Sequence, residues 1–194
     1  MKNRYLLVVF ALVGITLFSA VIADGKLIEL VQDVSVAKVV ETKQPVRLMI
    51  PAIGTDALIE SLGLTPEGIM DSPEGPANAG WYNLGVRPGE VGSAVIDGHS
   101  GWKNDTPAVF DNLHQLEPGD KIYIEDNKGI ITTFVVRESR TYNPEADASE
   151  VFFSNDDGSH LNLITCNGVW NEVTQNSSKR LVIFADKDMA NEGL

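Results

Sequence analysis

The chain has 194 residues, 43% of them hydrophobic, which is enough for one domain of ordinary size with a real core. Its formal net charge is −12, from 15 basic and 27 acidic residues. Because the phosphates of nucleic acids require a basic surface, this charge argues against a nucleic-acid partner.

The first predicted element is an uncharged stretch, Tyr5–Ala23, that follows Lys2 and Arg4. Its length is close to the roughly 20 apolar residues of a membrane-spanning helix, and the preceding cations favour a cytoplasmic N-terminus. A cleavable signal peptide is the alternative, because Val21–Ala23 resembles a cleavage site. Under either hypothesis, residues 1–23 bring the rest of the chain out of the cytoplasm.

Beyond this stretch, residues 24–44 are interpreted as a stalk or linker and 45–194 as one domain. The boundary falls there because the residue before a proline, here Pro45, is disfavoured in a helix. Some eight short strands with little helix then predict an all-β fold, a closed or nearly closed barrel. The clearest predicted strands start at Val46 and cover Ser93–Ile96, Lys121–Glu125, Ile130–Val136, Leu161–Thr165 and Leu181–Ala185.

The segments between these strands are predicted to be mostly loop. Residues 65–91 are rich in proline and glycine, and a polar loop is expected between 167 and 179. Two short helical segments are predicted, Asp105–Leu113 and Tyr142–Glu150, the first because Val109, Phe110 and Leu113 fall on one helical face.

The candidate site centres on Cys166, the only cysteine, which ends one predicted strand, and on Arg180, which precedes the next. A thiol attacks a carbonyl as thiolate, and an imidazole is its usual proton partner. His99 lies among glycines at the end of a strand, whereas His114 lies in a polar helix end. His160 is six residues from Cys166, roughly 20 Å along an extended chain. His99 is therefore the candidate by elimination.

These three residues together describe acyl transfer through a thioester, because a guanidinium can stabilise the oxyanion without losing its proton. Each residue alone is equally typical of a structural role: a packed cysteine, a turn histidine and a surface arginine. Residue types alone therefore leave open both a catalytic site and an inert buried thiol.

The surrounding sequence resembles the sortase family. Leu163-Ile-Thr-Cys166 followed by Arg180 is similar to the sortase signature, and Ala94-Val-Ile-Asp-Gly-His99 is similar to its histidine strand. The likeness covers roughly residues 45–187. Segments similar to the class called E or F are Arg47–Ile53, Gly80–Tyr82, Arg87–Glu90, Pro107–Leu113 and Pro118–Asp120.

The resemblance implies an eight-stranded sortase-type β-barrel with one or two short helices, preceded by an N-terminal transmembrane helix. It implies a single-pass membrane transpeptidase with an extracytoplasmic domain, which cleaves LPxTG-like sorting signals between Thr and Gly. Cys166 would hold the thioester, His99 would exchange protons and Arg180 would stabilise the oxyanion. The acceptor would be an amine of a peptidoglycan precursor or of a pilin-like protein.

Three further residues have two interpretations each. Asp97 either supports His99, since both fall on one face of an alternating strand, or is a solvent-facing acid. Thr165 is a candidate for substrate or oxyanion contact, and Trp170 either lines the substrate groove or covers the core. Acidic loop residues are common throughout the chain, so we expect no cofactor and no required metal.

Two other functions remain as alternatives. A cysteine hydrolase of the same geometry would resolve the thioester with water instead of an amine. A non-catalytic surface β-barrel binding module would bury an inert thiol. A papain-like protease is disfavoured, because its nucleophile sits on a helix and the residues around Cys166 predict strands.

Overall fold

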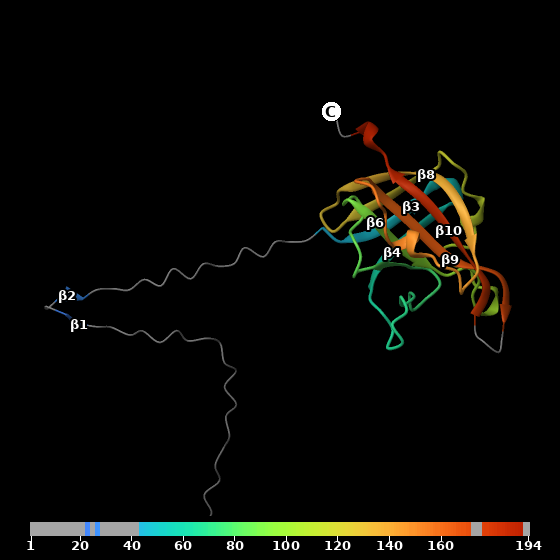
Figure 1. Cartoon of the computed structure of the whole chain (residues 1–194), viewed down its shortest axis with the longest axis horizontal. Helices are drawn as coiled ribbons and strands as arrows, with labels where there is room; N and C mark the ends of the chain where they lie inside the picture. Colours follow the sequence, from blue (N-terminus) through green and yellow to red (C-terminus); the bar gives the residue numbers. More distant parts are fainter. Residues whose placement is uncertain (1–21, 24–25, 28–42, 172–175, 192–194) are drawn as a thin grey trace, which may run out of the picture. The chain divides into compact units, whose positions relative to one another are not determined.

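A computed structural model describes residues 22–23, 26–27, 43–171 and 176–191 of the chain (Figure 1). The chain divides into two units, Met1–Val40 and Glu41–Leu194. In the first unit, β1 (Ile22–Ala23) pairs antiparallel with β2 (Lys26–Leu27). The rest of the predicted anchor and most of the predicted stalk lie outside the described residues. Within the described ranges, no helix is long and apolar enough to cross a membrane.

The second unit contains a closed barrel of eight strands, which confirms the predicted all-β barrel (Figure 1). Around the barrel the strands follow the order β10-β8-β7-β3-β4-β5-β6-β9. Their bounds are Pro45–Ile50 (β3), Thr55–Leu62 (β4), Ala79–Tyr82 (β5), Gly92–Gly98 (β6), Lys121–Asp126 (β7), Ile131–Tyr142 (β8), Ser159–Asn171 (β9) and Asn176–Lys187 (β10).

Helical structure in the described residues is limited to single turns. One α-helical turn, α1, precedes β9, and short 3-10 turns occur in the loops and after β10. These turns are Pro51–Ile53 (η1), Lys103–Asp105 (η2), Leu113–Gln115 (η3), Ser149–Phe152 (α1) and Met189–Asn191 (η4).

Two neighbouring pairs of strands are parallel, β4 with β5 and β6 with β9. The other pairs in the barrel are antiparallel. A parallel pair needs a long crossover connection, and here β7 and β8 form the crossover between β6 and β9. The crossover brings the end of β6 beside the middle of β9, two segments that are far apart in the sequence.

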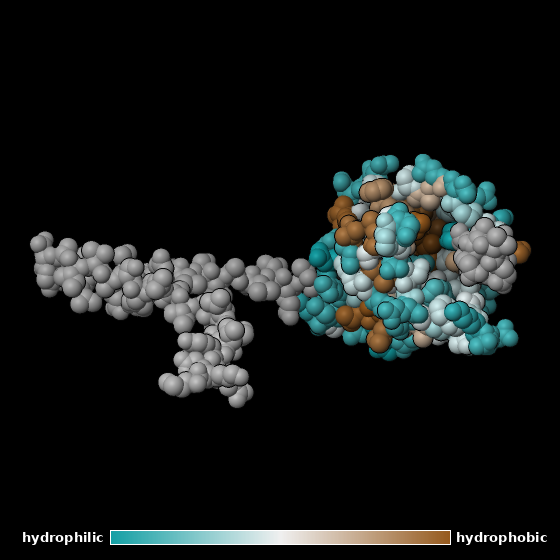
Figure 2. Space-filling model, turned by 90° about the horizontal axis from the view of Figure 1, so that it is seen from below, coloured by the Kyte–Doolittle hydropathy of each residue, from teal (hydrophilic) through white to brown (hydrophobic). Residues whose placement is uncertain are grey.

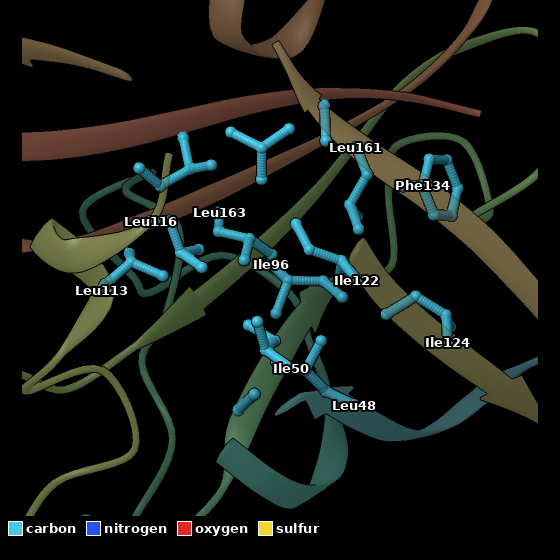
Figure 3. Close-up of a cluster of buried hydrophobic side chains, with 14 of the residues drawn as sticks. Leu48, Ile50, Ile96, Leu113, Leu116, Ile122, Ile124, Phe134, Leu161 and Leu163 are labelled. Atoms are coloured by element: carbon cyan, nitrogen blue, oxygen red, sulfur yellow. The ribbon is translucent and has the colours of Figure 1, made fainter. Parts of the chain in front are cut away.

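The interior of the barrel is filled by alternate residues of its strands (Figure 3). On β9, Leu161 and Leu163 are fully buried and point inward, so Asn162, Ile164 and Cys166 point to the outer face. The inward-facing core side chains labelled in Figure 3 are Leu48, Ile50, Ile96, Leu113, Leu116, Ile122, Ile124, Phe134, Leu161 and Leu163.

A second apolar cluster covers part of the outer face of β6, β9 and β10. Val151 of α1 is 1% exposed and packs there with Val182 and Phe184. The amide Nδ2 of Asn162 donates a 2.6 Å hydrogen bond to the Val151 carbonyl and so fixes α1 on the sheet. This confirms helix in the predicted segment 142–150, although only its last residues and the next two are helical.

The predicted helix Asp105–Leu113 is wrong. Asn104 and Asp105 adopt left-handed backbone angles, and 3-10 turns flank an irregular loop. The carboxylate of Asp111 accepts hydrogen bonds from the amides of Gly101 and Ala108, 2.6 and 2.8 Å long, and such side-chain bonds compete with a helix. The predicted apolar face is nevertheless buried, with Phe110 at 1% and Leu113 at 0% exposure.

The predicted polar loop between 167 and 179 is largely strand. β9 and β10 pair beyond the barrel as far as Asn171 and Asn176, in a long hairpin that is orange to red in Figure 1. A register shift lies between Ser177 and Lys179, opposite Gly168, whose φ of 82° suits a bulge. Turn-forming residues at this place therefore mark an irregularity within a ladder. On the face shown in Figure 2, apolar residues interrupt a largely hydrophilic surface.

Candidate active site

Strand register places His99, Cys166 and Arg180 in one row. Cys166 of β9 is the direct cross-strand partner of Arg180 of β10. On its other side β9 runs parallel to β6, and the last pair of this ladder, Asp97 beside Ile164, lies two residues before His99 and Cys166. β9 lies between β6 and β10 in the barrel, so Cys166 lies on the strand between the one that carries Arg180 and the one that leads into His99. All three residues are half-buried.

Thr165 joins β9 to β6 by a hydrogen bond next to this row. Its hydroxyl donates a 2.7 Å hydrogen bond to the carbonyl of Gly98, the residue before His99. The side chain is 2% exposed and faces the interior of the barrel, so this position does not favour the predicted contact with substrate. The bond joins the residue preceding the histidine to the residue preceding the cysteine, and it therefore sets their relative position.

His99 is held on several sides. Its Nε2 lies 2.8 Å from the carbonyl oxygen of Pro73, in the segment between β4 and β5. The indole of Trp102 packs against the imidazole with ring centres 4.6 Å apart. The main-chain carbonyl of His99 accepts a 2.9 Å bond from the Phe110 amide. The ring is thus oriented by groups outside the strand that carries it.

Gly98 allows this close packing. A Cβ atom at this position would lie 2.5 Å from the ring of Phe110, a distance that real structures do not show. The aromatic ring therefore occupies the space beside the histidine strand that any other residue would fill. This gives a packing reason for the Gly-His pair in the sequence.

Arg180 is directed by main-chain carbonyls of its own strand. Its Nη1 donates to the carbonyls of Ser177 and Lys179 at 3.3 and 3.0 Å. These bonds use part of the guanidinium, which carries five N–H donors in all. A cation fixed beside a thiol is the arrangement expected where negative charge develops on a carbonyl oxygen.

Asp97 lies two residues before His99 on the same face of β6. Burial raises the pKa of this carboxyl, although hydrogen bonds from the Ser72 side chain and the Gly98 amide and the charges of His99 and Arg180 oppose that rise. The carboxyl is half-buried, and its support of His99 stays a prediction.

The other sequence candidates lie elsewhere. The side chain of Trp170 lies outside the described residues. His114 is exposed, and its Nδ1 lies 3.1 Å from the carbonyl oxygen of Asp111, to which it can only donate. His160 binds the carboxylates of Asp156 and Asp186 through its two ring nitrogens, each at 2.7 Å. Neither histidine lies in the row with the thiol.

Two cavities in the described part of the domain lie away from the Cys166–Arg180 pair. One, of about 120 Å³, has Arg87 and Lys187 in its wall, and the other, of about 190 Å³, lies between Phe184 and Asn162. A search of the described residues for three or more His, Cys, Asp or Glu side chains that could share a metal ion finds no such group. The candidate site is therefore the row itself.

Sequence patterns miss the partners of His99. Pro73 lies in a segment predicted as loop, and nothing in its local pattern points to a residue much later in the chain. Trp102 gives a weak signal, as a large aromatic residue that closely follows a histidine within a glycine-rich loop. Asn162 gives a second weak signal, as an amide inside an otherwise apolar strand.

The fold is an eight-stranded closed barrel with a single cysteine beside an arginine on the neighbouring strand, and comparison with known proteins identifies its family. Residues 48–188 match the family model described as "Sortase domain". The match spans most of the chain, which therefore belongs to the sortase family. No curated protein sequence matches the chain.

Solved structures of sortases have the same fold. Sortase C-1 from Actinomyces oris is 26% identical, with a TM-score of 0.59 over 75% of each chain. Streptococcus agalactiae sortase C1, solved in complex with MTSET, is 25% identical with a TM-score of 0.58, over 75% of this chain and 69% of that one. Sortase C2 from pilus island 1 of group B Streptococcus shares the fold, at 22% identity and a TM-score of 0.55 over 74% and 73%. The likeness to class E or F stays a prediction.

Proposed function

We propose that this protein is a cysteine transpeptidase that cleaves an LPxTG-like C-terminal sorting signal between Thr and Gly. It would then transfer the released protein to an amine acceptor at the cell surface. The observation that carries the proposal is the row of His99, Cys166 and Arg180 on three neighbouring strands of a sortase-family barrel.

Cys166 is the nucleophile in this proposal. It is half-buried, it is the only cysteine of the chain, and it is flanked by two groups that favour a thiolate when both are charged. The thiolate attacks the carbonyl carbon of the threonine in the sorting signal. The carbon–sulfur bond forms and the carbon–nitrogen bond to glycine then breaks, which leaves a thioester on the enzyme.

His99 carries the protons in both halves of the reaction. As imidazolium it gives a proton to the departing glycine amine, and as imidazole it takes one from the attacking amine. Arg180 keeps its proton throughout and stabilises the oxyanion of both tetrahedral intermediates. In this proposal the two roles belong to separate residues, and the position of β9 between β6 and β10 supports that division.

The surface next to the row suits an apolar peptide segment. On the same outer face, Ile164 lies one pleat away from Cys166 and is partly buried against the apolar cluster that packs α1. Tyr82, Tyr142 and Phe152 are half-buried in the same cluster. Such a surface favours a leucine-proline sequence over a charged one.

The acceptor is proposed to be a primary amine of a peptidoglycan precursor or of a pilin-like protein. The proposal also includes a membrane location, with residues 1–23 as anchor and the domain 45–194 outside the cytoplasm. The charge of this stretch and its flanks supports that orientation.

The test uses the purified full-length chain and an internally quenched LPxTG-type peptide, with and without a glycine-based amine. Mass spectrometry follows the products and any acyl-enzyme. We expect cleavage between Thr and Gly, ligation to the amine, and loss of both in Cys166→Ala. Arg180→Ala should lower kcat by about 10²–10³-fold, as removal of one oxyanion donor does. Arg47→Ala is the matched control, since this arginine pairs with Asp56 on the surface of β3 and β4.

The other outcomes decide between the remaining functions. Cleavage without ligation to any amine would identify a hydrolase. If a varied peptide library yields no cleavage and no acyl-enzyme mass at Cys166, the proposal is wrong and a binding module is left. A methanethiosulfonate reagent then tests the thiol directly, because an inert buried cysteine reacts only after unfolding.

A further inference from the structure

The segment between β4 and β5, residues 63–78, is the teal loop that extends from the barrel in Figure 1. Its turn is closed by main-chain hydrogen bonds from Thr65 to Ile69, 2.8 Å, and from Asp71 to Gly63, 3.1 Å. Near its end, the amide Nδ2 of Asn78 donates a 2.7 Å bond to Glu60 on β4. These bonds give the segment a defined turn and join its end to the barrel. We call residues 63–78 the β4–β5 segment.

The buried residue Pro73 is where this segment meets the catalytic row. Its carbonyl oxygen lies 2.8 Å from His99 Nε2. A carbonyl oxygen can only accept a hydrogen bond, so Nε2 must carry a hydrogen while this contact exists. In the neutral ring the lone pair is then on Nδ1, and Nδ1 is the only ring nitrogen that can gain or lose a proton without breaking the contact.

Two further groups restrain His99 from outside β6. The indole of Trp102 packs against the imidazole with ring centres 4.6 Å apart, and the Phe110 amide donates a 2.9 Å hydrogen bond to the His99 carbonyl. His99 directly follows Gly98, the last residue of β6, so these contacts hold a residue that lies just beyond the strand.

We infer that the Pro73 carbonyl is a positioning group for His99, which fixes the imidazole so that Nδ1 is the atom that exchanges protons with substrate. The inference rests on the proposed transpeptidase function, because it assigns a role to one atom of the proposed acid–base residue. Pro73 acts through its main-chain carbonyl, and Trp102 packs against the ring that this carbonyl orients.

The proton balance follows directly. In acylation the imidazolium carries hydrogens on both nitrogens, and Nδ1 gives its proton to the glycine nitrogen as the carbon–nitrogen bond breaks. In transfer, Nδ1 takes a proton from the attacking amine, while the carbon–sulfur bond breaks and the thiolate leaves. The Nε2 hydrogen stays on the Pro73 carbonyl in both steps, so the ring keeps its orientation across the whole cycle.

Nuclear magnetic resonance of ¹⁵N-histidine-labelled full-length protein tests the contact without any turnover. The three histidines serve as internal references, since His160 has both ring nitrogens bonded to carboxylates and His114 is exposed. We expect the Nε2 hydrogen of His99 to exchange slowly with water, like those of His160. Pro73→Gly should speed this exchange at least tenfold, whereas Glu67→Ala, an exposed change in the same segment, should not.

Steady-state kinetics test the catalytic consequence. Pro73→Gly frees the backbone that carries the carbonyl, and it should lower kcat about tenfold with KM within twofold of wild type. Pro73→Ala keeps the carbonyl on a backbone less flexible than that of glycine and should retain more of kcat. A purely structural role for the segment would instead change stability and KM together.

The outcomes separate this inference from the proposed function. If His99 exchanges its Nε2 hydrogen as fast as His114 does, or if Pro73→Gly keeps full kcat, the positioning role is overturned while the transpeptidase can stand. If the slow exchange is present and sensitive to Pro73→Gly but no acyl-enzyme forms on Cys166, the contact exists and the proposed function fails. That second result also overturns the catalytic role assigned to Nδ1.

Discussion

The chemistry depends on single side chains whose neighbours come from distant parts of the chain. Cys166 and Arg180 face each other because β9 and β10 form an antiparallel ladder, and their pairing is visible from the sequence as two strands joined by a short connection. His99 reaches them only through the parallel pairing of β6 with β9. The hydroxyl of Thr165 stabilises this second pairing next to the site, because it donates a hydrogen bond to the Gly98 carbonyl.

Thr165→Val is expected to destabilise the site, although valine and threonine are almost the same size. The change is nearly isosteric, but it leaves the buried carbonyl of Gly98 without the 2.7 Å hydrogen bond that it accepts from the threonine hydroxyl. We expect a loss of about 1–3 kcal/mol in the free energy of unfolding and a lower kcat, because the residue before His99 is released.

Chemical denaturation and steady-state kinetics measure the two effects of this change. Thr165→Ser keeps the hydroxyl and should retain more of both stability and activity than Thr165→Val. Thr141→Val, an exposed threonine on β8, is the matched control. Equal stability of Thr165→Val and wild type would contradict the structural role assigned here to this hydroxyl.

At the scale of elements, the histidine strand is shaped by what packs against its end. The loop after β6 returns over the strand so that the Phe110 ring lies against Gly98 and the Phe110 amide binds the His99 carbonyl. Hydrophobic spacing predicts that Phe110 and Leu113 are buried, and they are. It does not predict the irregular path, because the side chain of Asp111 supplies the loop with bonds that a helix would have made internally.

Gly98→Ala should therefore disturb both the core and the site. The added methyl group would meet the Phe110 ring, so either the ring or the strand must move, at a typical cost of about 1–3 kcal/mol. We expect a lower melting temperature and strongly reduced acyl-enzyme formation, measured by thermal denaturation and mass spectrometry. Gly75→Ala, where a Cβ atom meets nothing within 4 Å, is the matched control. If Gly98→Ala keeps full activity and stability, the Phe110 ring can move aside at little cost, and the prediction is wrong.

At the scale of the whole domain, a second histidine is expected to make the stability of the barrel depend on pH. His160 starts β9 and binds Asp186 of β10 and Asp156 of the preceding loop. Burial lowers the pKa of His160, but the hydrogen bonds to the two carboxylates outweigh burial and raise it above its usual value. Asp186 also lies 3.5 Å from Arg137 of β8, so the cluster spans three strands.

The domain should accordingly lose stability as pH rises from neutral to alkaline values. A raised histidine pKa contributes stability that is fully present below the unfolded value near 6.5 and is lost as pH rises through the higher folded value. Because both carboxylates are partly solvated, we expect the contribution to be about 1 kcal/mol. His160→Gln should remove this pH dependence between pH 6 and 9.

Urea unfolding followed by the fluorescence of the buried Trp81 measures this effect at each pH. The pKa of Asp156 is held below its usual range, first by the hydrogen bond from His160, so the same contact also weakens as pH falls through the carboxylate range. His114→Gln is the matched control, because that ring is exposed. A wild-type protein whose stability varies with pH in the same way as that of His160→Gln would rule out this contribution.

The sequence by itself determined which residues face the core and which residue types are available for chemistry. Alternation along β9 separates Leu161 and Leu163 from Cys166, because successive side chains of a strand point to opposite faces whatever the partner strands are. The sequence also identifies the candidate residues for chemistry, which are one cysteine, a histidine among glycines and an arginine before an apolar run. These properties are local, so a linear pattern contains them.

Only the tertiary structure decided what surrounds these residues. The parallel register that brings Gly98 against Thr165, and the β4–β5 segment that brings Pro73 to His99, join parts of the chain with no shared local pattern. Such contacts are fixed by closure of the barrel, which allows each strand only two neighbours, and by the loops that must cross its surface. The orientation of His99, the proposed acid–base residue, therefore depends on the fold as a whole.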